Sequence, residues 1–316
     1  MEPIEKVLDE ILGGRDGVFA VMARDLKTGE EVLRNPDTLM PTASVFKVPV
    51  LVELFRKAGL GVIDLHMRHE LKEEDKCPGS GVLKEMLPGV RLTFEDLAVL
   101  MIIISDNTAT DLCVNAAGIY DINATMRGLG IANSYITMGC KGLLAYCAGI
   151  ENPWPSNEEV ALSFERLKAG QIDYDGLAFK GVKENNVTTV RDMVNLLQIL
   201  YEGTKLPQEV CKGCLDVMKR QQLRDRIPGL LPLGTVTMTK SGTLGANVIV
   251  NDVGIVEPAD GNPYAIAILT NQEPRDDSRQ LPAVISRAIY DHFTGKNELD
   301  DKHCVSINSG GELNDS

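Results

Sequence analysis

Alternating hydrophobic and polar residues near both ends of the chain predict strands. Residues 18–24 and 31–33 form two such runs, and the polar, glycine-containing stretch between them is typical of a hairpin turn. Three more strand-like runs occur late in the chain, at residues 235–240, 247–257 and 264–271. Strands are therefore expected on either side of a long middle region.

That middle region has the spacing of helices. Between residues 60 and 202 the chain is predicted to be mainly helical, and further helices are expected at residues 4–12 and 281–293. We predict one α/β domain, in which the helical part is inserted between the early and late strands. The predicted divisions are a domain over 1–296, its α/β part over 1–59 and 203–296, its helical part over 60–202, and a polar, acidic, mobile tail over 297–316.

The composition is that of a soluble enzyme. Lys and Arg total 32 against 45 for Asp and Glu, and the resulting net charge of −13 disfavours nucleic acid and anionic membranes as partners. Seven scattered cysteines, an odd number, fit a reducing compartment better than a disulfide framework. Residues 1–6 lack the basic start of a secretory signal. We therefore expect a cytoplasmic location.

Ser44 and Lys47 stand three positions apart, just ahead of a strongly apolar, helix-like run. Residues at i and i+3 share one face of a helix, so the Lys47 amine can reach back to the Ser44 hydroxyl and take its proton. Two common residues adopt this spacing by chance in many proteins. The pair therefore indicates a catalytic serine only if other motifs supply the residues that such a site still lacks.

A second motif, Ser105-Asp106-Asn107, follows directly after the apolar stretch 97–104. The helix that contains this stretch is expected to begin at Thr93, because Asp96 stands three positions later as in a capping box. The motif adds a hydroxyl and an amide to the candidate site.

A third motif, Lys240-Ser241-Gly242-Thr243, ends the alternating run 235–239. A small residue and a glycine after the lysine would let a substrate lie against the strand edge. The similar triplet at residues 27–29 precedes Ser44 and falls in the predicted hairpin turn, so we assign it no catalytic role.

In this order the three motifs resemble those of the active-site serine, penicillin-recognising enzymes, most closely the class A β-lactamase superfamily. Segments 78–83, 226–228 and 251–254 also look like the family, and the resemblance extends from about residue 18 to about residue 294. It implies a β-lactamase-like α/β (α+β) fold, with an antiparallel sheet flanked by helices and an inserted all-α subdomain.

The position of Ser44 at the start of a helix would place backbone N–H groups near the oxyanion that forms when its hydroxyl attacks a carbonyl. Lys47 is the candidate base, because a second lysine nearby, Lys240, would make each amine easier to deprotonate. The resemblance implies that Ser105 passes a proton to the leaving atom and that Asn107 orients Lys47 and the substrate. It also implies that a carboxylate or carbonyl of the substrate is held by Lys240, Ser241, Gly242 and Thr243, the last also contributing its N–H to the oxyanion hole. The expected product is an acyl-enzyme on Ser44.

The glutamate that releases the acyl group in class A β-lactamases, in a Glu-x-x-Leu-Asn loop, has no counterpart motif here. The corresponding region, residues 138–186, is longer than usual for the family. Glu159 is the nearest substitute, since Leu162 follows it at the right distance although the asparagine is absent. We consider Glu159 as the deacylation base, against the alternative of a solvated helix face.

Three functions follow as hypotheses. The first is an intracellular serine hydrolase that cleaves a small amide, lactam or ester; the second is a true β-lactamase or D,D-peptidase-like enzyme; the third is a non-catalytic sensor that traps a ligand on Ser44. No cofactor or metal is expected, because Cys211 and Cys214 lack a second ligand pair and His66 and His69, placed on one helical face, lack a third ligand. Two cysteines of the altered region, Cys140 and Cys147, are candidates to line the pocket.

Overall fold

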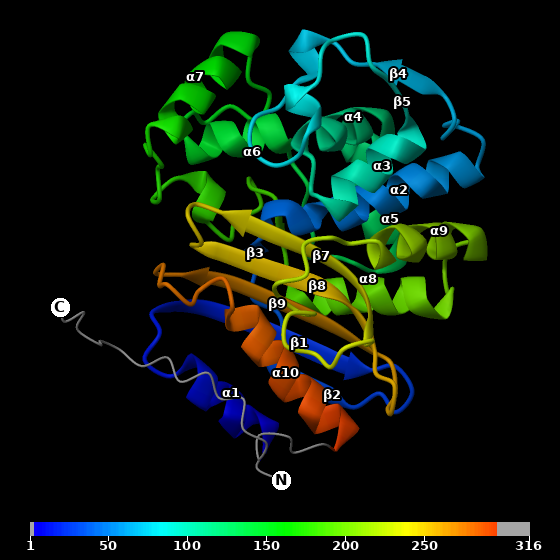
Figure 1. Ribbon diagram of the computed structural model, residues 1–316, viewed down its shortest axis with the longest axis vertical. Helices are drawn as coiled ribbons and strands as arrows, with labels where there is room; N and C mark the ends of the chain where they lie inside the picture. Colours follow the sequence, from blue (N-terminus) through cyan, green and yellow to red (C-terminus); the bar gives the residue numbers. More distant parts are fainter. Residues whose placement is uncertain (1–2, 296–316) are drawn as a thin grey trace, which may run out of the picture.

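The computed structural model describes residues 3–295. The predicted tail at 297–316 lies outside the described residues. The main sheet of the protein has five antiparallel strands in the order β2-β1-β9-β8-β7 (Figure 1). These strands are β1 (Gly17–Asp25), β2 (Glu31–Arg34), β7 (Val236–Leu244), β8 (Ile249–Glu257) and β9 (Tyr264–Gln272). β1 pairs with β9 from Gly17↔Gln272 to Asp25↔Tyr264, so strands from the two ends of the sequence lie side by side.

Helices cover both faces of this sheet, and this explains why its central strands are apolar on both sides. Along β1, Ala20 and Met22 pack into one core, while Val21 and Ala23 pack into the other. One face is covered by α1 (Ile4–Leu12) and α10 (Leu281–Thr294). The opposite face carries α8 (Val190–Glu202) and, beside it, α9 (Gln208–Lys219).

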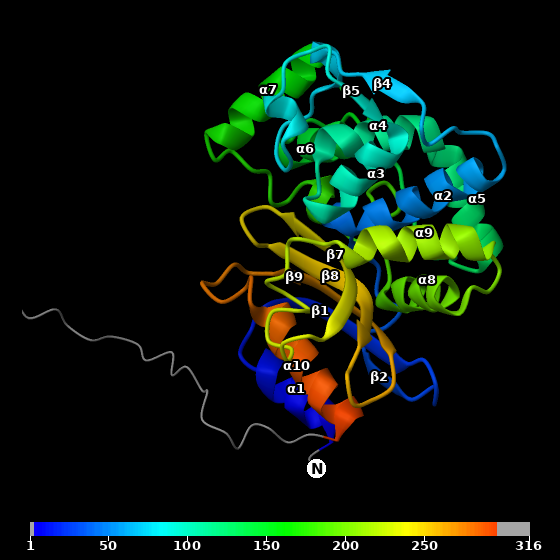
Figure 2. The same cartoon turned by 45° about the vertical axis from the view of Figure 1, so that its right-hand side comes forward.

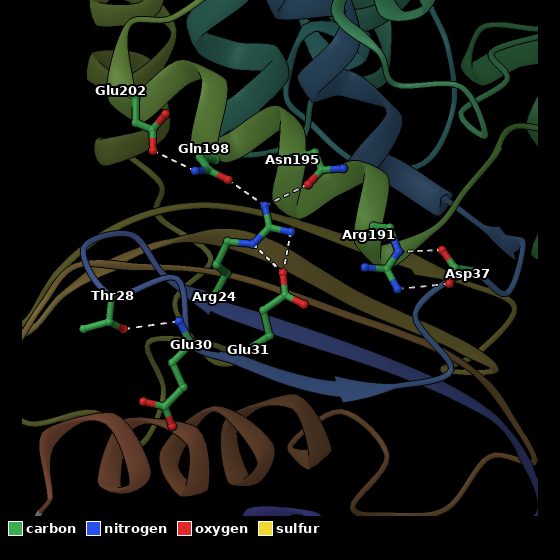
Figure 3. Close-up of polar contacts among 9 residues, drawn as sticks. All are labelled: Arg24, Thr28, Glu30, Glu31, Asp37, Arg191, Asn195, Gln198 and Glu202. Carbon is green, nitrogen blue, oxygen red and sulfur yellow. Dashed lines mark hydrogen bonds and ion pairs between the residues drawn. The ribbon is translucent and has the colours of Figure 1, made fainter.

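The edge of the sheet is tied to α8 by polar contacts that Figure 3 shows. Arg24 of β1 donates to Glu31 Oε1 of β2, to Asn195 Oδ1 and to Gln198 Oε1, at 2.6–2.8 Å. A second ion pair joins Arg191 of α8 to Asp37. α8 therefore packs on the sheet, although the predicted helical part ran to residue 202.

The helical part lies on the far side of α8 and α9 from α1 and α10 (Figure 2). Its helices are α2 (Lys47–Gly59), α3 (Phe94–Ile103), α4 (Asn107–Ala117), α5 (Ile119–Leu129), α6 (Cys140–Cys147) and α7 (Asn157–Lys168). Two small sheets accompany them, one from β3 (Met40–Pro41) and β6 (Val187–Thr188), the other from β4 (Arg68–Glu70) and β5 (Arg91–Thr93). Short 3₁₀ turns are η1 (Ala43–Phe46), η2 (Glu73–Asp75), η3 (Leu83–Glu85) and η4 (Leu177–Phe179).

Local sequence signals account for several of these boundaries. Thr93 caps α3 in a capping box with Asp96, as predicted. The stretch at 27–29 is the turn of the β1–β2 hairpin, which confirms that assignment. The placement of His66 and His69 on a helix is wrong, because residues 68–70 form β4 and His69 pairs with Asp75. No helix within residues 3–295 is long and apolar enough to span a bilayer.

Candidate active site

Ser44 lies in the 3₁₀ turn η1, and Lys47 is the first residue of the α-helix that follows. The residue before Ser44, Ala43, has a φ of 43°, a conformation that an L side chain rarely adopts. Ser44 is partly exposed, whereas Lys47 is fully buried. The hydroxyl is therefore open to a ligand, while the amine is sealed inside the protein.

The Lys47 amine is directed at the second motif. Its Nζ donates to the Ser105 carbonyl at 2.8 Å, to Ser105 Oγ at 3.0 Å and to Asn107 Oδ1 at 3.0 Å. Three acceptors of the second motif therefore surround the Lys47 amine. The expected direct contact between Lys47 Nζ and Ser44 Oγ is not among the hydrogen bonds of the described residues, because the second motif occupies the amine.

Lys240 approaches the same hydroxyl from the sheet. Its Nζ lies 3.0 Å from Ser105 Oγ and 2.6 Å from the Ser241 carbonyl. Burial, and next the positive charge of Lys47, hold the pKa of Lys240 well below the usual value for a lysine. Two lysine amines, one from α2 and one from β7, therefore meet on the single hydroxyl of Ser105.

Ser105 sits in a strained turn between two helices. α3 ends at Ile103, α4 begins at Asn107, and Ser105 between them has a φ of 59°. Such a conformation costs on the order of 1–3 kcal/mol, and it persists only where the surroundings determine it. In this conformation Ser105 Oγ lies 3.0 Å from the Nζ atoms of both Lys47 and Lys240.

The other two residues of the second motif hold the wall of the site. Asp106 caps α4 through Ala109 N, and its second carboxylate oxygen accepts from the backbone N–H groups of Val82 and Leu83. Asn107 Nδ2 donates to the Pro78 carbonyl at 2.8 Å. These contacts fix the segment 78–83 beside the two lysines.

Glycines in that segment allow the close approach. A Cβ on Gly79 would lie 2.7 Å from Asn107 Nδ2, and one on Gly81 would lie 2.2 Å from Asp106 Oδ2. Both glycines also have positive φ. The segment that looked like the family in sequence is therefore built around the side chains of the second motif.

The third motif runs along β7, which continues to Leu244 because Ser241, Gly242 and Thr243 pair with β8. A Cβ on Gly242 would lie 2.8 Å from Ser44 N, so the strand packs directly against the backbone of the serine. The predicted end of the strand at residue 240 is wrong. The longer strand is what brings the third motif to Ser44.

Arg226 supports this end of β7 from a buried position. Its guanidinium donates to the Gly242 carbonyl at 2.8 Å, to the Asn251 carbonyl at 2.7 Å and to Thr243 Oγ1. Burial lowers the pKa of Arg226 and raises that of the nearby Asp252 to about 6. In the sequence Arg226 stands out only as part of the flanking segment 226–228, and no local signal indicates that it reaches β7.

Ser44 opens into a pocket of about 260 Å³. The residues that line it are Ser44, Gly79, Ser80, Asn107, Cys140, Leu143, Leu144, Thr243, Leu244, Gly245 and Ala246. Cys140 is among them and Cys147 is not, and burial raises the pKa of the Cys140 thiol to about 12. None of these lining residues carries a carboxylate.

Comparisons with known proteins agree with this geometry. The beta-lactamase enzyme family matches residues 3–293. This chain belongs to the beta-lactamase enzyme family. It is 28% identical over 302 residues to the beta-lactamase regulatory protein BlaB of Streptomyces cacaoi, a match that covers 89% of this chain and 94% of that protein. It is 24% identical over 273 residues to beta-lactamase SME-1 of Serratia marcescens, covering 86% of this chain and 81% of that one.

Solved structures of the family share the fold. A beta-lactamase from Sphaerobacter thermophilus is 27% identical and superposes with a TM-score of 0.74 over 92% of this chain and 97% of that one. PBP-A is 23% identical, with a TM-score of 0.74 over 93% of this chain and 96% of that chain. The predicted membership of the β-lactamase-like serine hydrolases and the predicted fold class are confirmed.

Glu159 does not join the site of this beta-lactamase family member. Its carboxylate accepts from Ser156 N at 2.7 Å and from Asn152 Nδ2 at 3.0 Å, while its own N–H donates to Ser156 Oγ. Glu159 thus completes the capping box of α7 and is not among the residues lining the Ser44 pocket. Of the two alternatives for Glu159, deacylation base or helix face, these contacts favour the helix face. Ser156 and Glu159, three positions apart, gave the signal for a capping box.

The described residues also contain no cluster of side chains suited to a metal ion. Within residues 3–295 no three His, Cys, Asp or Glu side chains are arranged to hold a metal ion. Cys211 and Cys214 are buried in α9, where Cys211 Sγ contacts the carbonyls of Ile199 and Leu206. Burial raises the pKa of both thiols.

The contact between Gly242 and Ser44 gives a steric prediction. Gly242→Ala places a methyl group 2.8 Å from Ser44 N, so strand and serine must separate. We expect the rate of Ser44 acylation to fall on the order of a hundredfold. Stopped-flow kinetics with a chromogenic ester would measure it. Gly128→Ala in α5, where a Cβ meets nothing within 4 Å, is the matched control and should acylate at the wild-type rate. Equal rates for both variants would contradict the prediction.

Proposed function

We propose that this protein is a serine hydrolase that cleaves an amide, lactam or ester through an acyl-enzyme on Ser44. The observation that carries the proposal is the position of Ser105 Oγ, 3.0 Å from both Lys47 Nζ and Lys240 Nζ, beside a pocket that Ser44 and Asn107 line. A hydroxyl between a charged and a neutral amine can both release and recover a proton. The family membership supports the same reaction type.

In the first half-reaction, Ser44 Oγ forms a bond to the substrate carbonyl carbon and the bond from that carbon to the leaving nitrogen or oxygen breaks. The proton of Ser44 passes by way of Ser105 to the Lys240 amine, and Ser105 then delivers a proton to the leaving atom, recovered from Lys240. We therefore assign the base role to Lys240 rather than to Lys47. The lowered pKa of Lys240 and the distance of 3.0 Å between its Nζ and Ser105 Oγ support this assignment. Lys47 would instead supply fixed positive charge and hold Ser105 and Asn107 in place.

Substrate binding would use the end of β7. The backbone of Ser44 lies against Gly242, which supports an oxyanion hole formed by the N–H groups of Ser44 and Thr243. The guanidinium of Arg226 brings positive charge to this end of the strand and donates to Thr243 Oγ1. A carboxylate on the leaving part of the substrate would fit this end of the pocket.

The second half-reaction lacks an evident base. Water needs a proton acceptor to attack the acyl-enzyme, and no carboxylate is among the residues lining the pocket. We propose that deacylation is slow, so that the acyl-enzyme accumulates. This also keeps the sensor alternative open, and the likeness to a protein named as a regulator favours that alternative.

A carboxylate placed in the pocket should accelerate deacylation. Leu144 is suitable because it lines the pocket, is only partly buried, and has its Cδ1 3.7 Å from the Cβ position of Gly79, next to Asn107. We expect Leu144→Glu to shorten the lifetime of the acyl-enzyme by roughly tenfold or more. Time-resolved mass spectrometry would measure the decay of the adduct. Leu144→Gln has nearly the same shape without the base, and an equal acceleration in that variant would contradict the explanation.

The decisive experiment is mass spectrometry of the intact protein after incubation with a panel of amides, esters and β-lactams. A transient adduct with product release supports a hydrolase. A persistent adduct without turnover supports the sensor, and rapid turnover of nitrocefin supports a true β-lactamase. If no compound in the panel forms an adduct on Ser44, the proposed function is wrong.

A further inference from the structure

A second hollow lies next to the Ser44 pocket, between α7 and the segment that contains η2 and η3. It has a volume of about 690 Å³, against about 260 Å³ for the Ser44 pocket. We call it the α7 groove, and its walls include Pro78, Lys84, Lys141, Val160, Ala161 and Phe164. Figure 1 shows α7 (green) over α6, on the same side of the helical part as the cyan segment that follows β4. The helix belongs to the region that the sequence marks as longer than usual.

The groove and the Ser44 pocket share their walls. Pro78 lines the groove and Gly79, the next residue, lines the pocket. On the other side Lys141 lines the groove and Cys140 lines the pocket. Residues adjacent in the chain therefore line the two hollows on both sides, which places the groove beside the Ser44 pocket.

The size of the two hollows indicates which ligands need the groove. Pockets for small organic ligands are usually about 300–1,000 Å³ in volume. The Ser44 pocket alone falls just below this range and would hold the reacting group with little beyond it. A larger acyl group has to extend beyond the pocket.

Two of the three lysines that line the groove have a carboxylate partner, and the third donates to a backbone carbonyl. Lys76 Nζ pairs with Glu73 at 2.8 Å, and Lys84 Nζ lies 3.3 Å from Glu85. Lys141 Nζ donates to the Glu74 carbonyl at 2.6 Å. A ligand with its own charge would have to compete with these partners. The paired charges therefore favour an uncharged occupant over an anionic one.

The helix wall is apolar. Asn157, Val160, Ala161 and Phe164 follow the spacing i, i+3, i+4 and i+7, so they form one stripe along α7, and this stripe faces the groove. Phe164 is 46% exposed although it faces a concave surface. Leu162, on the same helix and 41% exposed, is not part of the groove. An apolar chain laid on the stripe would remove Val160, Ala161 and Phe164 from water.

We propose that the α7 groove binds the acyl part of the substrate and that this part is an extended, uncharged, apolar chain. The proposal rests on the proposed acylation of Ser44 and adds the substrate class. The substrate is then an ester or amide of a medium-chain or aryl-alkyl carboxylic acid. Its acyl chain runs from Ser44 past Pro78 and Lys141 to Phe164, while the leaving group lies toward Ser105 and β7.

The test compares two esters with the same leaving group, p-nitrophenyl acetate and p-nitrophenyl octanoate, below the concentration at which the octanoate forms micelles. We expect the wild-type protein to favour the octanoate in kcat/KM by about tenfold or more, after correction for the spontaneous hydrolysis of each ester. Phe164→Ser should lower that preference by roughly tenfold, because the chain loses its main apolar contact. Leu162→Ser, the matched control, should retain the wild-type preference.

The outcomes separate the two proposals. If Ser44 is acylated by the acetate but the octanoate is not preferred, the groove proposal fails and the proposed function stands. An equal loss of preference in Phe164→Ser and Leu162→Ser would also overturn the groove proposal. If neither ester acylates Ser44, the proposed function fails and the groove proposal with it. Thermal unfolding of each variant shows whether it is folded, and the exposed position of both side chains favours this.

Discussion

Replacement of Ser44 by alanine should abolish both the acyl adduct and ester cleavage. We expect kcat/KM to fall by on the order of a thousandfold or more, because the atom that forms the covalent bond is lost and the two lysines have no nucleophile to serve. The substitution removes one partly exposed oxygen and leaves the contacts of Lys47, Ser105 and Lys240 intact. Chromogenic ester kinetics and the intact mass of the protein would record the two losses.

Ser80 provides the matched control, because it is a second serine among the residues that line the pocket. Ser80→Ala should still acquire the adduct, and peptide mapping should locate it on Ser44. An adduct that persists in Ser44→Ala would show that another residue is the nucleophile. Cys140 would be the first to examine, but its raised pKa makes the thiol a poor nucleophile.

Loss of the Lys240 amine should have the second-largest effect. We expect Lys240→Met to lower kcat/KM by about a hundredfold to ten-thousandfold, the usual range for removal of a general base. Lys240→Arg should be as impaired as Lys240→Met, because a guanidinium keeps its charge and cannot accept a proton. Activity near the wild-type level in Lys240→Arg would show that only the positive charge is needed at this position.

The pH dependence of kcat/KM tests the same role. Only the neutral amine accepts a proton, so the rate should fall as the pH decreases through the pKa of Lys240. Burial and the charge of Lys47 place that pKa well below the usual lysine value, so the decline should occur at a much lower pH than for an exposed lysine. A profile from about pH 5 to about pH 10 covers the relevant range of lysine and histidine values. Persistence of the same acidic limb in Lys240→Met would assign it to another group.

Most secondary structure could be predicted because its causes are local. The period of hydrophobic residues gave α1 its bounds, Ile4–Leu12, and the Thr93 cap gave the start of α3. The error at the end of β7 has a non-local cause. Residues 241–243 have no strong strand pattern of their own, and they are extended because β8 pairs with them.

The residues of the candidate site could be predicted from the sequence, but the hydrogen bonds among them could not. The three motifs named Ser44, Ser105 and Lys240 as members. The hydrogen bond from Lys47 to Ser105 joins residues 58 positions apart, and that from Lys240 joins residues 135 positions apart. Sequence spacing carries no information on such distances. It therefore suggested Lys47 as the base, whereas the lowered pKa of Lys240 favours Lys240 in that role.

The sequence by itself determined which residues make up the candidate site, because a serine, two lysines and an amide occur in three motifs in a specific order. The tertiary structure decided that the pKa of Lys240 is lowered, since burial and a neighbouring charge control a pKa and both depend on packing. It also decided that Glu159 caps α7, that Arg226 supports β7, and that a second hollow lies beside α7. These features arise where distant segments meet, so only the folded chain contains them.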